Sequence, residues 1–164
     1  MERLTCCITG HKDIPAQQID YVKAALNHEI DKAIADGYTY FISGFGDGVE
    51  QLFAEIVITR KEHNPLLQLI AVLPYRKRLE TLQKKDRTKL LLEGCADVVI
   101  IREEYIPSVY SHRNRYMIEK SARVIAVYDG REQGGTVNAI RFTHELRKEL
   151  REIPVGRTII MPSN

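Results

Sequence analysis

The chain has 164 residues, of which 44% are hydrophobic and 28% charged, a composition typical of a soluble globular protein. Because 24 basic and 22 acidic side chains nearly balance, no global charge favours nucleic acid or a membrane surface. The length predicts a single domain over residues 1–164, and without a signal peptide or an apolar run long enough for a bilayer we expect a cytoplasmic protein.

Apolar runs alternate with amphipathic segments along the chain. The apolar runs predict strands over residues 4–9, 38–42, 68–73, 97–101 and 124–128, with a candidate sixth strand over 157–161. The amphipathic segments predict helices over residues 16–35, 49–61, 77–92, 108–120 and 137–150. Strands rich in Val and Ile and separated by helices are typical of a parallel sheet covered on both faces. We therefore expect an α/β protein, a three-layer α/β/α sandwich with a mainly parallel sheet of five to six strands.

Cysteine and histidine residues show no spacing typical of a metal site. Cys6 and Cys7 are adjacent in the first predicted strand, so their side chains should point to opposite faces of the sheet. Together with Cys95 they form an odd set, best interpreted as buried thiols in a reducing compartment, with a reactive role as the alternative. We predict neither a bound metal nor a cofactor.

Two glycine-rich turns follow buried strand patterns, residues 43–48 and 130–136. Each leads into a predicted helix. Glycine lets backbone N–H groups approach a ligand closely, and a helix N-terminus favours negative charge. Neither turn has a Walker pattern, and the first departs from the G-x-G-x-x-G spacing, so tight strand-to-helix turns are the alternative. Because ligands of such sheets bind beyond the carboxyl ends of the strands, the two turns together predict a phosphate- or nucleotide-binding cleft.

The candidate ligand-binding residues all lie just beyond predicted strand ends or in the helix over residues 108–120. They are Gly10, His11, Ser43, Gly44, Gly46, Asp47, Gly48, Glu50, Arg76, Arg113, Asn114, Gly134, Gly135 and Thr136.

Several of these residues have two interpretations each. Thr136 can bind phosphate or cap its helix, and His11 can pair with phosphate or lie in an exposed loop. Glu50, the candidate catalytic residue, can hold ribose hydroxyls or act as nucleophile or base. Arg113 and Asn114 can bind a base edge or phosphate with Tyr110 stacking. The alternative is a helix that docks its aromatic residues on the sheet with its arginines outward.

Four motifs together resemble the SLOG superfamily, and its YpsA/YoqJ-like branch in particular. The motifs are Thr9-Gly10-His11-Lys12, Ser43-Gly44-Phe45-Gly46-Asp47-Gly48-Val49-Glu50, Tyr110-x-x-Arg113-Asn114-x-x-Met117 and Gly134-Gly135-Thr136. The resemblance covers nearly the whole chain and implies a Rossmann-like fold with a nucleotide-type ligand at the glycine turns. The superfamily includes the Lonely Guy phosphoribohydrolases and the DNA-processing protein DprA.

The chain departs from the motifs of this superfamily at four positions. The second motif of the superfamily resembles Ser-Gly-Gly-Ala-x-Gly-x-Asp. In this chain Phe45, Gly46 and Glu50 replace the second Gly, the Ala and the Asp of that motif. The corresponding motif of the Lonely Guy enzymes resembles Pro-Gly-Gly-x-Gly-Thr-x-x-Glu. Ala139 occupies the position of its Glu, which argues against hydrolysis by their route.

Three functions follow from these patterns. The leading hypothesis is a protein that binds, or senses, a nucleotide or nucleotide derivative at the two glycine turns. The alternatives are a hydrolase or transferase that acts on the N-glycosidic bond of nucleotides, and a nucleic-acid-binding protein of DprA type that uses basic residues in 77–89 and 113–123. The expected partner is a nucleotide-type small molecule, less so nucleic acid, with no membrane; a homo-oligomer is compatible with the sequence.

Overall fold

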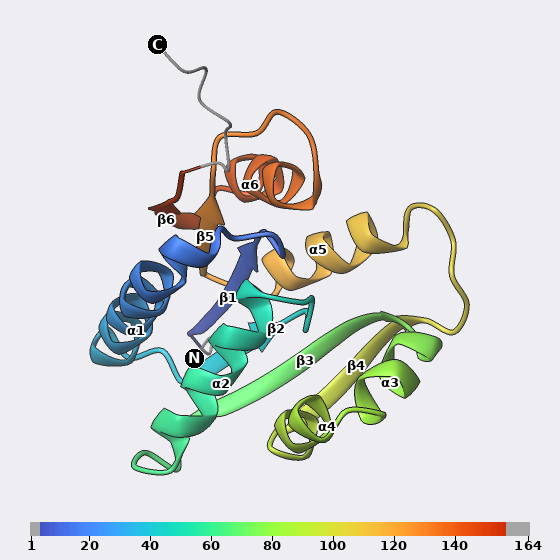
Figure 1. Cartoon of the computed structure of the whole chain (residues 1–164), viewed down its shortest axis with the longest axis horizontal. Coiled ribbons are helices and arrows are strands. Elements are labelled where there is room, and N and C mark those ends of the chain that lie inside the picture. Colours follow the sequence, from blue (N-terminus) through green and yellow to red (C-terminus); the bar gives the residue numbers. More distant parts are fainter. Residues whose placement is uncertain (1–3, 157–164) are drawn as a thin grey trace.

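A computed structural model describes residues 4–156 and contains one six-stranded sheet, in which every strand pair is parallel (Figure 1). The strand order is β4-β3-β2-β1-β5-β6. The strands are β1 (Thr5–Gly10), β2 (Tyr40–Ser43), β3 (Gln68–Tyr75), β4 (Asp97–Arg102), β5 (Arg123–Tyr128) and β6 (Glu149–Pro154).

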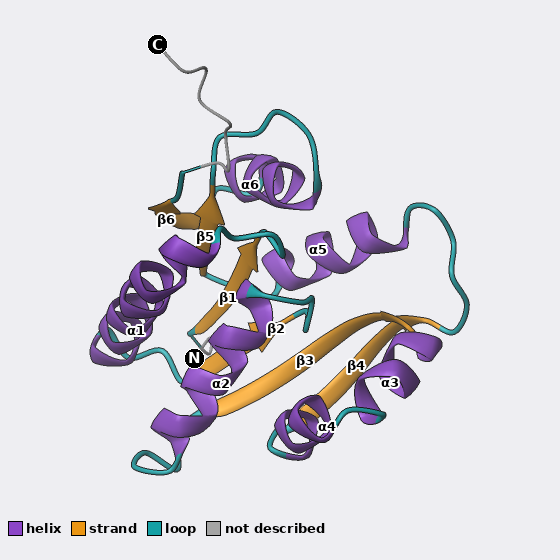
Figure 2. Ribbon diagram, viewed as in Figure 1, coloured by secondary structure: helices purple, strands orange, loops and turns teal. Residues whose placement is uncertain are grey.

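Helices connect successive strands and cover both faces of the sheet (Figure 2). They are α1 (Ile19–Ala35), α2 (Val49–Lys61), α3 (Arg76–Gln83), α4 (Asp86–Glu93), α5 (Val109–Glu119) and α6 (Gly135–Glu145), with a short 3₁₀ helix, η1 (Ala16–Gln18). One core cluster joins α1 to α4 with one face of the sheet, and a second joins α5 and α6 with the other face. This three-layer arrangement confirms the predicted fold class.

The two neighbouring cysteines show how β1 serves both layers. Cys6 belongs to the core under α1 and α2, while Cys7 belongs to the core under α5 and α6. Both thiols are buried, and burial raises the pKa of Cys7 to about 12. The predicted opposite orientation of the two side chains is confirmed.

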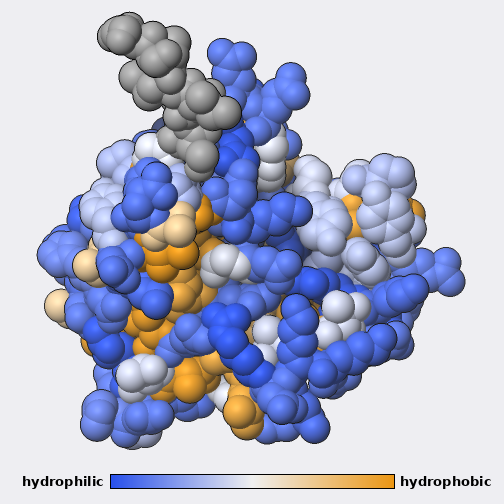
Figure 3. Space-filling model, viewed as in Figure 1, coloured by the Kyte–Doolittle hydropathy of each residue, from blue (hydrophilic) through white to orange (hydrophobic). Residues whose placement is uncertain are grey.

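The exposed surface in the view of Figure 3 is mainly hydrophilic, with an apolar strip between α1 and α2. Partly buried side chains of both helices pack against the core there. In the described part of the chain, no helix combines the length and the apolar character that a membrane crossing requires.

The predicted helix over residues 77–92 is wrong, because the chain forms two helices there. Lys85 has an extended backbone between α3 and α4, and the Thr88 hydroxyl donates a hydrogen bond to the Lys85 carbonyl at 3.3 Å. Leu82 and Leu91 are nine residues apart, so a continuous helix would turn them about 180° away from each other. The break allows both side chains to enter the same core cluster.

The last predicted helix is also too long. It ends at Glu145 rather than at residue 150, and Arg147 adopts a left-handed backbone conformation with φ of 54°. The chain then reverses into β6, which pairs with β5 and buries Ile153. The sixth strand therefore lies earlier than expected, and the predicted strand over 157–161 falls outside the described residues.

The order of the strands places the candidate site. From β1 the chain moves outward through β2, β3 and β4, and then returns to place β5 on the other side of β1. The connections after β1 and β5 therefore diverge from neighbouring strand ends, which is the position where open parallel sheets form a ligand crevice. Both predicted glycine turns lie at this carboxyl edge of the sheet, after β2 and after β5.

Candidate functional site

A cleft of about 630 Å³ opens at the carboxyl ends of β1, β2 and β5. Its volume lies within the range of roughly 300–1,000 Å³ that is usual for small-molecule sites. The predicted site residues that line it are Gly10, His11, Gly46, Asp47, Glu50, Arg113, Asn114, Gly134, Gly135 and Thr136. The fold thus brings residues from four separate segments of the chain to one place, while their role in ligand binding stays a prediction.

Glu50 and Arg113 form the centre of the cleft. Glu50 lies in the first turn of α2 and Arg113 in α5; their exposed fractions are 8% and 7%. Nη2 of Arg113 lies 3.9 Å from Oε1 of Glu50, so the two charges attract without a hydrogen bond. Within residues 4–156, Oε1 of Glu50 and Nε of Arg113 are among the buried side-chain atoms that have no hydrogen-bond partner.

The other nitrogens of Arg113 are held by the protein. Nη1 donates to the carbonyl of Gly44 at 3.1 Å, and Nη2 donates to Oδ1 of Asn114 at 3.3 Å. Nδ2 of Asn114 in turn donates to the carbonyl of Gly135 at 3.3 Å. Asn114 therefore links Arg113 to the start of α6, and both ends of its amide contact the protein.

The first glycine turn surrounds the carboxylate of Glu50. A Cβ atom on Gly46 would lie 2.8 Å from Oε2 of Glu50, and one on Gly44 would lie 2.9 Å from Cζ of Arg113 and closer still to Oε1 of Glu50. The intervening Phe45 is fully buried with φ of 56°, so it fixes the turn to the core. These two glycines leave room for the protein's own charged pair.

The remaining glycines near the first turn serve close packing. A Cβ atom on Gly10 would lie 2.8 Å from Cβ of Val49, so Gly10 lets β1 and the start of α2 meet. Gly48 has φ of 81°, and a Cβ atom there would lie 2.9 Å from the carbonyl oxygen of Lys12. Together they hold the loops after β1 and β2 against each other.

Predicted site residues that do not line the cleft are Ser43, Gly44, Gly48 and Arg76. The Ser43 hydroxyl donates to the carbonyl of Glu50 at 2.8 Å and accepts from the N–H of Phe45 at 3.1 Å, so it shapes the turn. Arg76 is exposed and pairs with Glu103 at 2.8 Å.

The second glycine turn differs from the first because it faces open space. A Cβ atom on Gly135 would meet Nδ2 of Asn114 only at the ordinary contact distance of 3.7 Å. Gly134 caps α6 with φ of 126°, and no side chain caps this helix. The first N–H groups of a helix have no intrahelical acceptor and carry partial positive charge. The turn therefore presents donors to the cleft beside the buried Thr136.

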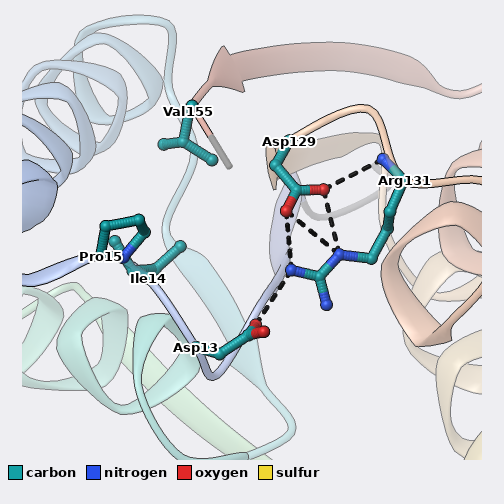
Figure 4. A pocket seen from close by; sticks show the side chains of 7 residues that line it. Asp13, Ile14, Pro15, Asp129, Arg131 and Val155 are labelled. Atoms are coloured by element: carbon teal, nitrogen blue, oxygen red, sulfur yellow. Dashed lines mark hydrogen bonds and ion pairs between the residues drawn. The ribbon is translucent and has the colours of Figure 1, made fainter. Parts of the chain in front are cut away.

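Charged groups join the loops after β1 and β5. Arg131 donates to Asp129 at 2.7 Å and to Asp13 at 3.0 Å, and its guanidinium lies between the two carboxylates (Figure 4). Nε2 of His11 lies 3.1 Å from Oδ1 of Asp129. The hydrogen bonds from Arg131, assisted by the nearby His11, lower the pKa of Asp129 to about 2. His11 is buried, so the exposed-loop interpretation of this residue is wrong.

The cleft also has lining residues outside the predicted set of ligand-binding residues, although the sequence also indicates Tyr110 and Arg78. These lining residues are Thr9, Lys12, Asp13, Arg78, Tyr110 and Arg131. Arg78, rather than Arg76, reaches the first glycine turn, where it donates to the carbonyl of Phe45 at 3.0 Å. The sequence offers both arginines as candidates. Residues two positions apart in a helix point about 200° apart, so only one of them can face the cleft, and the choice requires the start of the helix to be known.

Helix α5 agrees with one sequence interpretation only in part. The alternative to ligand binding placed its aromatic residues on the sheet and its arginines outward. In the structure Tyr116 packs against the core and the Arg115 side chain is exposed, as this alternative predicts. Arg113, however, is buried, while Tyr110 is 42% exposed and lines the cleft. In residues 4–156, no group of three or more His, Cys, Asp or Glu side chains has an arrangement suited to a metal ion.

The model of the YspA SLOG family matches residues 6–155. The chain belongs to this family. A UPF0398 protein of Bacillus pumilus is 29% identical over 142 residues, which cover 77% of this chain and 74% of that protein. A UPF0398 protein of Halalkalibacterium halodurans is 29% identical over 120 residues, 71% of this chain and 64% of that protein. The predicted resemblance to the SLOG group is confirmed.

Two solved structures resemble this SLOG protein. One, from a study of single-stranded DNA binding by DNA processing protein A of Helicobacter pylori, has a TM-score of 0.67 and 18% identity, and covers 96% of this chain and 67% of that chain. The other, the Moco carrier protein of Chlamydomonas rheinhardtii, has a TM-score of 0.53 and 12% identity, and covers 92% and 75%. They support the Rossmann-like α/β fold.

Proposed function

We propose that this SLOG protein binds a nucleotide-type small molecule in the cleft described above. The phosphate lies at Gly134, Gly135 and Thr136, and the ribose lies at the Glu50–Arg113 pair. Residues 1–164 act as one nucleotide-binding domain in this proposal. A cytoplasmic location stays a prediction from the sequence.

The observation that carries the proposal is the pair of buried polar atoms without partners. Leaving a buried donor or acceptor unpaired costs about 1–3 kcal/mol, more for charged groups. Oε1 of Glu50 and Nε of Arg113 both carry this cost; the two atoms are buried, and their side chains line the cleft. When these two side chains turn toward the cleft, a ribose hydroxyl group can donate to the carboxylate and a ligand oxygen can accept from the guanidinium. A ligand that draws them into contact in this way removes a cost that the empty protein retains.

The start of α6 supplies the complementary site for phosphate. Its backbone N–H groups and the Thr136 hydroxyl are donors, the exposed glycines leave room for a ligand, and the helix dipole favours an anion. Asn114 links this turn to Arg113, so hydrogen bonds connect the phosphate half and the ribose half of the proposed site.

A thermal-shift and calorimetry panel of AMP, ADP, NAD and ADP-ribose tests the proposal. A ligand at about 100 times its dissociation constant adds roughly 2.7 kcal/mol of stability. At about 2–4 °C per kcal/mol for a chain of this size, the unfolding midpoint rises by about 5–11 °C.

Two aspartate variants provide the matched comparison. Gly135→Asp places a carboxylate in the cleft at a helix N-terminus, where aspartate suits the fold but repels phosphate. Asn138→Asp adds the same charge to the exposed side of α6, outside the cleft. We expect ligand binding in the wild type and in Asn138→Asp, and its loss in Gly135→Asp with the fold intact. Equal binding by all three proteins, or no binding by the wild type, would contradict the proposal.

The neighbour from the study of single-stranded DNA binding favours nucleic acid as a second candidate ligand. A steep fall of oligonucleotide affinity with salt would support it.

Chromatography of the nucleotide panel after incubation tests the hydrolase hypothesis at the same time. Release of a free base that depends on Glu50 would make this carboxylate catalytic.

A further inference from the structure

Three tyrosines form a cluster beside the cleft, and one of them lines it. Tyr75 ends β3, Tyr105 lies between β4 and α5, and Tyr110 lies in the first turn of α5. The ring of Tyr75 meets the ring of Tyr105 edge-on at 5.5 Å between centroids and the ring of Tyr110 edge-on at 6.3 Å. Tyr105 and Tyr110 are 58% and 42% exposed, so this cluster is not part of the core.

Tyr110 is the member of the cluster that lines the cleft. Its ring is held in place, because the ring of Tyr75 meets it nearly at a right angle and the guanidinium of Arg113 lies over it, 5.2 Å from its centroid. Burial of its hydroxyl, together with a hydrogen bond with Tyr75, raises the pKa of Tyr110, so the ring stays neutral at physiological pH. A fixed, neutral and partly exposed aromatic ring is a surface on which a planar group can stack.

The groups of the cleft follow one another across the sheet. The start of α6 follows β5, Glu50 follows β2, and Tyr110 lies against Tyr75 at the end of β3. In the sheet, β5, β1, β2 and β3 are successive neighbours. Three strand spacings of about 4.8 Å give about 14 Å from the phosphate end to the tyrosine end. This span is comparable with the length of an extended nucleoside monophosphate.

We propose that Tyr110, braced by Tyr75 and Arg113, stacks against the base of a nucleoside 5′-phosphate that lies across the cleft. The inference rests on the proposed function, which places the phosphate at α6 and the ribose at Glu50. It adds an orientation, with the base toward α3 and α5. It also adds a requirement, because a ligand with no planar ring would lack this contact.

Paired titrations with AMP and ribose 5-phosphate test the stacking contact. Ribose 5-phosphate keeps the phosphate and the sugar but has no base. Removal of an aromatic stacking partner typically lowers affinity by about 5- to 150-fold per base. We expect Tyr110→Ala to lose affinity for AMP by this factor and to keep its affinity for ribose 5-phosphate. Tyr110→Phe retains the ring and should bind AMP as the wild type does.

A fluorescent AMP analogue, 1,N⁶-etheno-AMP, provides a readout that a merely structural role of Tyr110 would not move. The chain has no tryptophan, so the emission of the probe can be followed without overlap from the protein. Stacking on Tyr110 should quench the bound probe in the wild type and in Tyr110→Phe, but not in Tyr110→Ala. Unfolding midpoints of the variants measured without ligand show whether the fold is retained.

The outcomes separate the two proposals. If the wild type binds AMP and ribose 5-phosphate equally and Tyr110→Ala changes neither, the base does not stack here, while the phosphate site stands. If neither compound binds, the proposed function fails and this inference fails with it. Binding of short single-stranded DNA without binding of AMP would likewise overturn the inference, because the cluster would then serve nucleic acid.

Discussion

Replacement of Gly44 by alanine tests whether the first glycine turn is shaped by the protein's own charged pair. The added Cβ would lie 2.9 Å from Cζ of Arg113 and closer still to Oε1 of Glu50. Both distances are below the closest approach that side chains normally make. Glu50 is enclosed by the turn, and Arg113 is bonded to Gly44 and Asn114, so neither can move away without loss of contacts.

The expected magnitude follows from the cost of overpacking, which is about 1–3 kcal/mol. For a chain of this length, each kcal/mol lowers the unfolding midpoint by about 2–4 °C, so Gly44→Ala should unfold about 2–12 °C below the wild type. Thermal and urea unfolding followed by circular dichroism measure the difference. In a Glu50→Ala background the cost of Gly44→Ala should shrink, because the nearest obstructing atom is gone.

Gly135→Ala is the matched control in the second turn. The nearest neighbour of its Cβ would be Nδ2 of Asn114, at an ordinary 3.7 Å. Alanine is favoured over glycine in a helix by up to about 1 kcal/mol, so this variant should be as stable as the wild type or slightly more stable. The reasoning is refuted if Gly44→Ala unfolds at the wild-type midpoint, or if both alanines destabilise equally.

Two further predictions concern charged groups outside the Glu50–Arg113 pair. Arg123→Met should lower the free energy of unfolding by about 1–3 kcal/mol, because Arg123 donates to both Asp36 and Glu149 at 2.8 Å; unchanged stability in urea unfolding would contradict this. Ligand affinity should stay the same, since Arg123 is the first residue of β5 and the cleft lies at the other, carboxyl end of this strand. Hydrogen bonds from Arg131 lower the pKa of Asp129 to about 2, so this carboxylate stabilises the fold above about pH 4 and ceases to do so as the pH falls through 2. The stability difference between wild type and Asp129→Asn, up to about 2 kcal/mol, should therefore disappear over that interval in acid unfolding curves; a constant difference would show that the ionised carboxylate is not what matters.

Local sequence patterns were sufficient for most of the fold. Five of the apolar runs became strands because a buried parallel strand needs continuous Val and Ile, and that requirement acts within a few residues. Glycines and charged residues at the strand ends likewise marked the cleft. The resemblance to the SLOG group added the nucleotide-type ligand that the proposed function adopts.

Long-range packing decided what the patterns missed. The break between α3 and α4 exists because Leu82 and Leu91 must reach one core, which no local propensity encodes. The position of β6 likewise depends on pairing with β5.

Tertiary packing also sets the direction in which each cleft side chain points. The sequence placed Arg113 in a helix and the SLOG resemblance made it a candidate, but its burial depends on the carbonyl of Gly44, 69 residues earlier in the chain. The same packing leaves Tyr110 exposed at the mouth of the cleft. Sequence therefore indicated which segments gather at the cleft, because strand ends meet at one edge. Only the tertiary structure decided which of their side chains face the ligand space, because a charged group can be buried only where distant partners meet it.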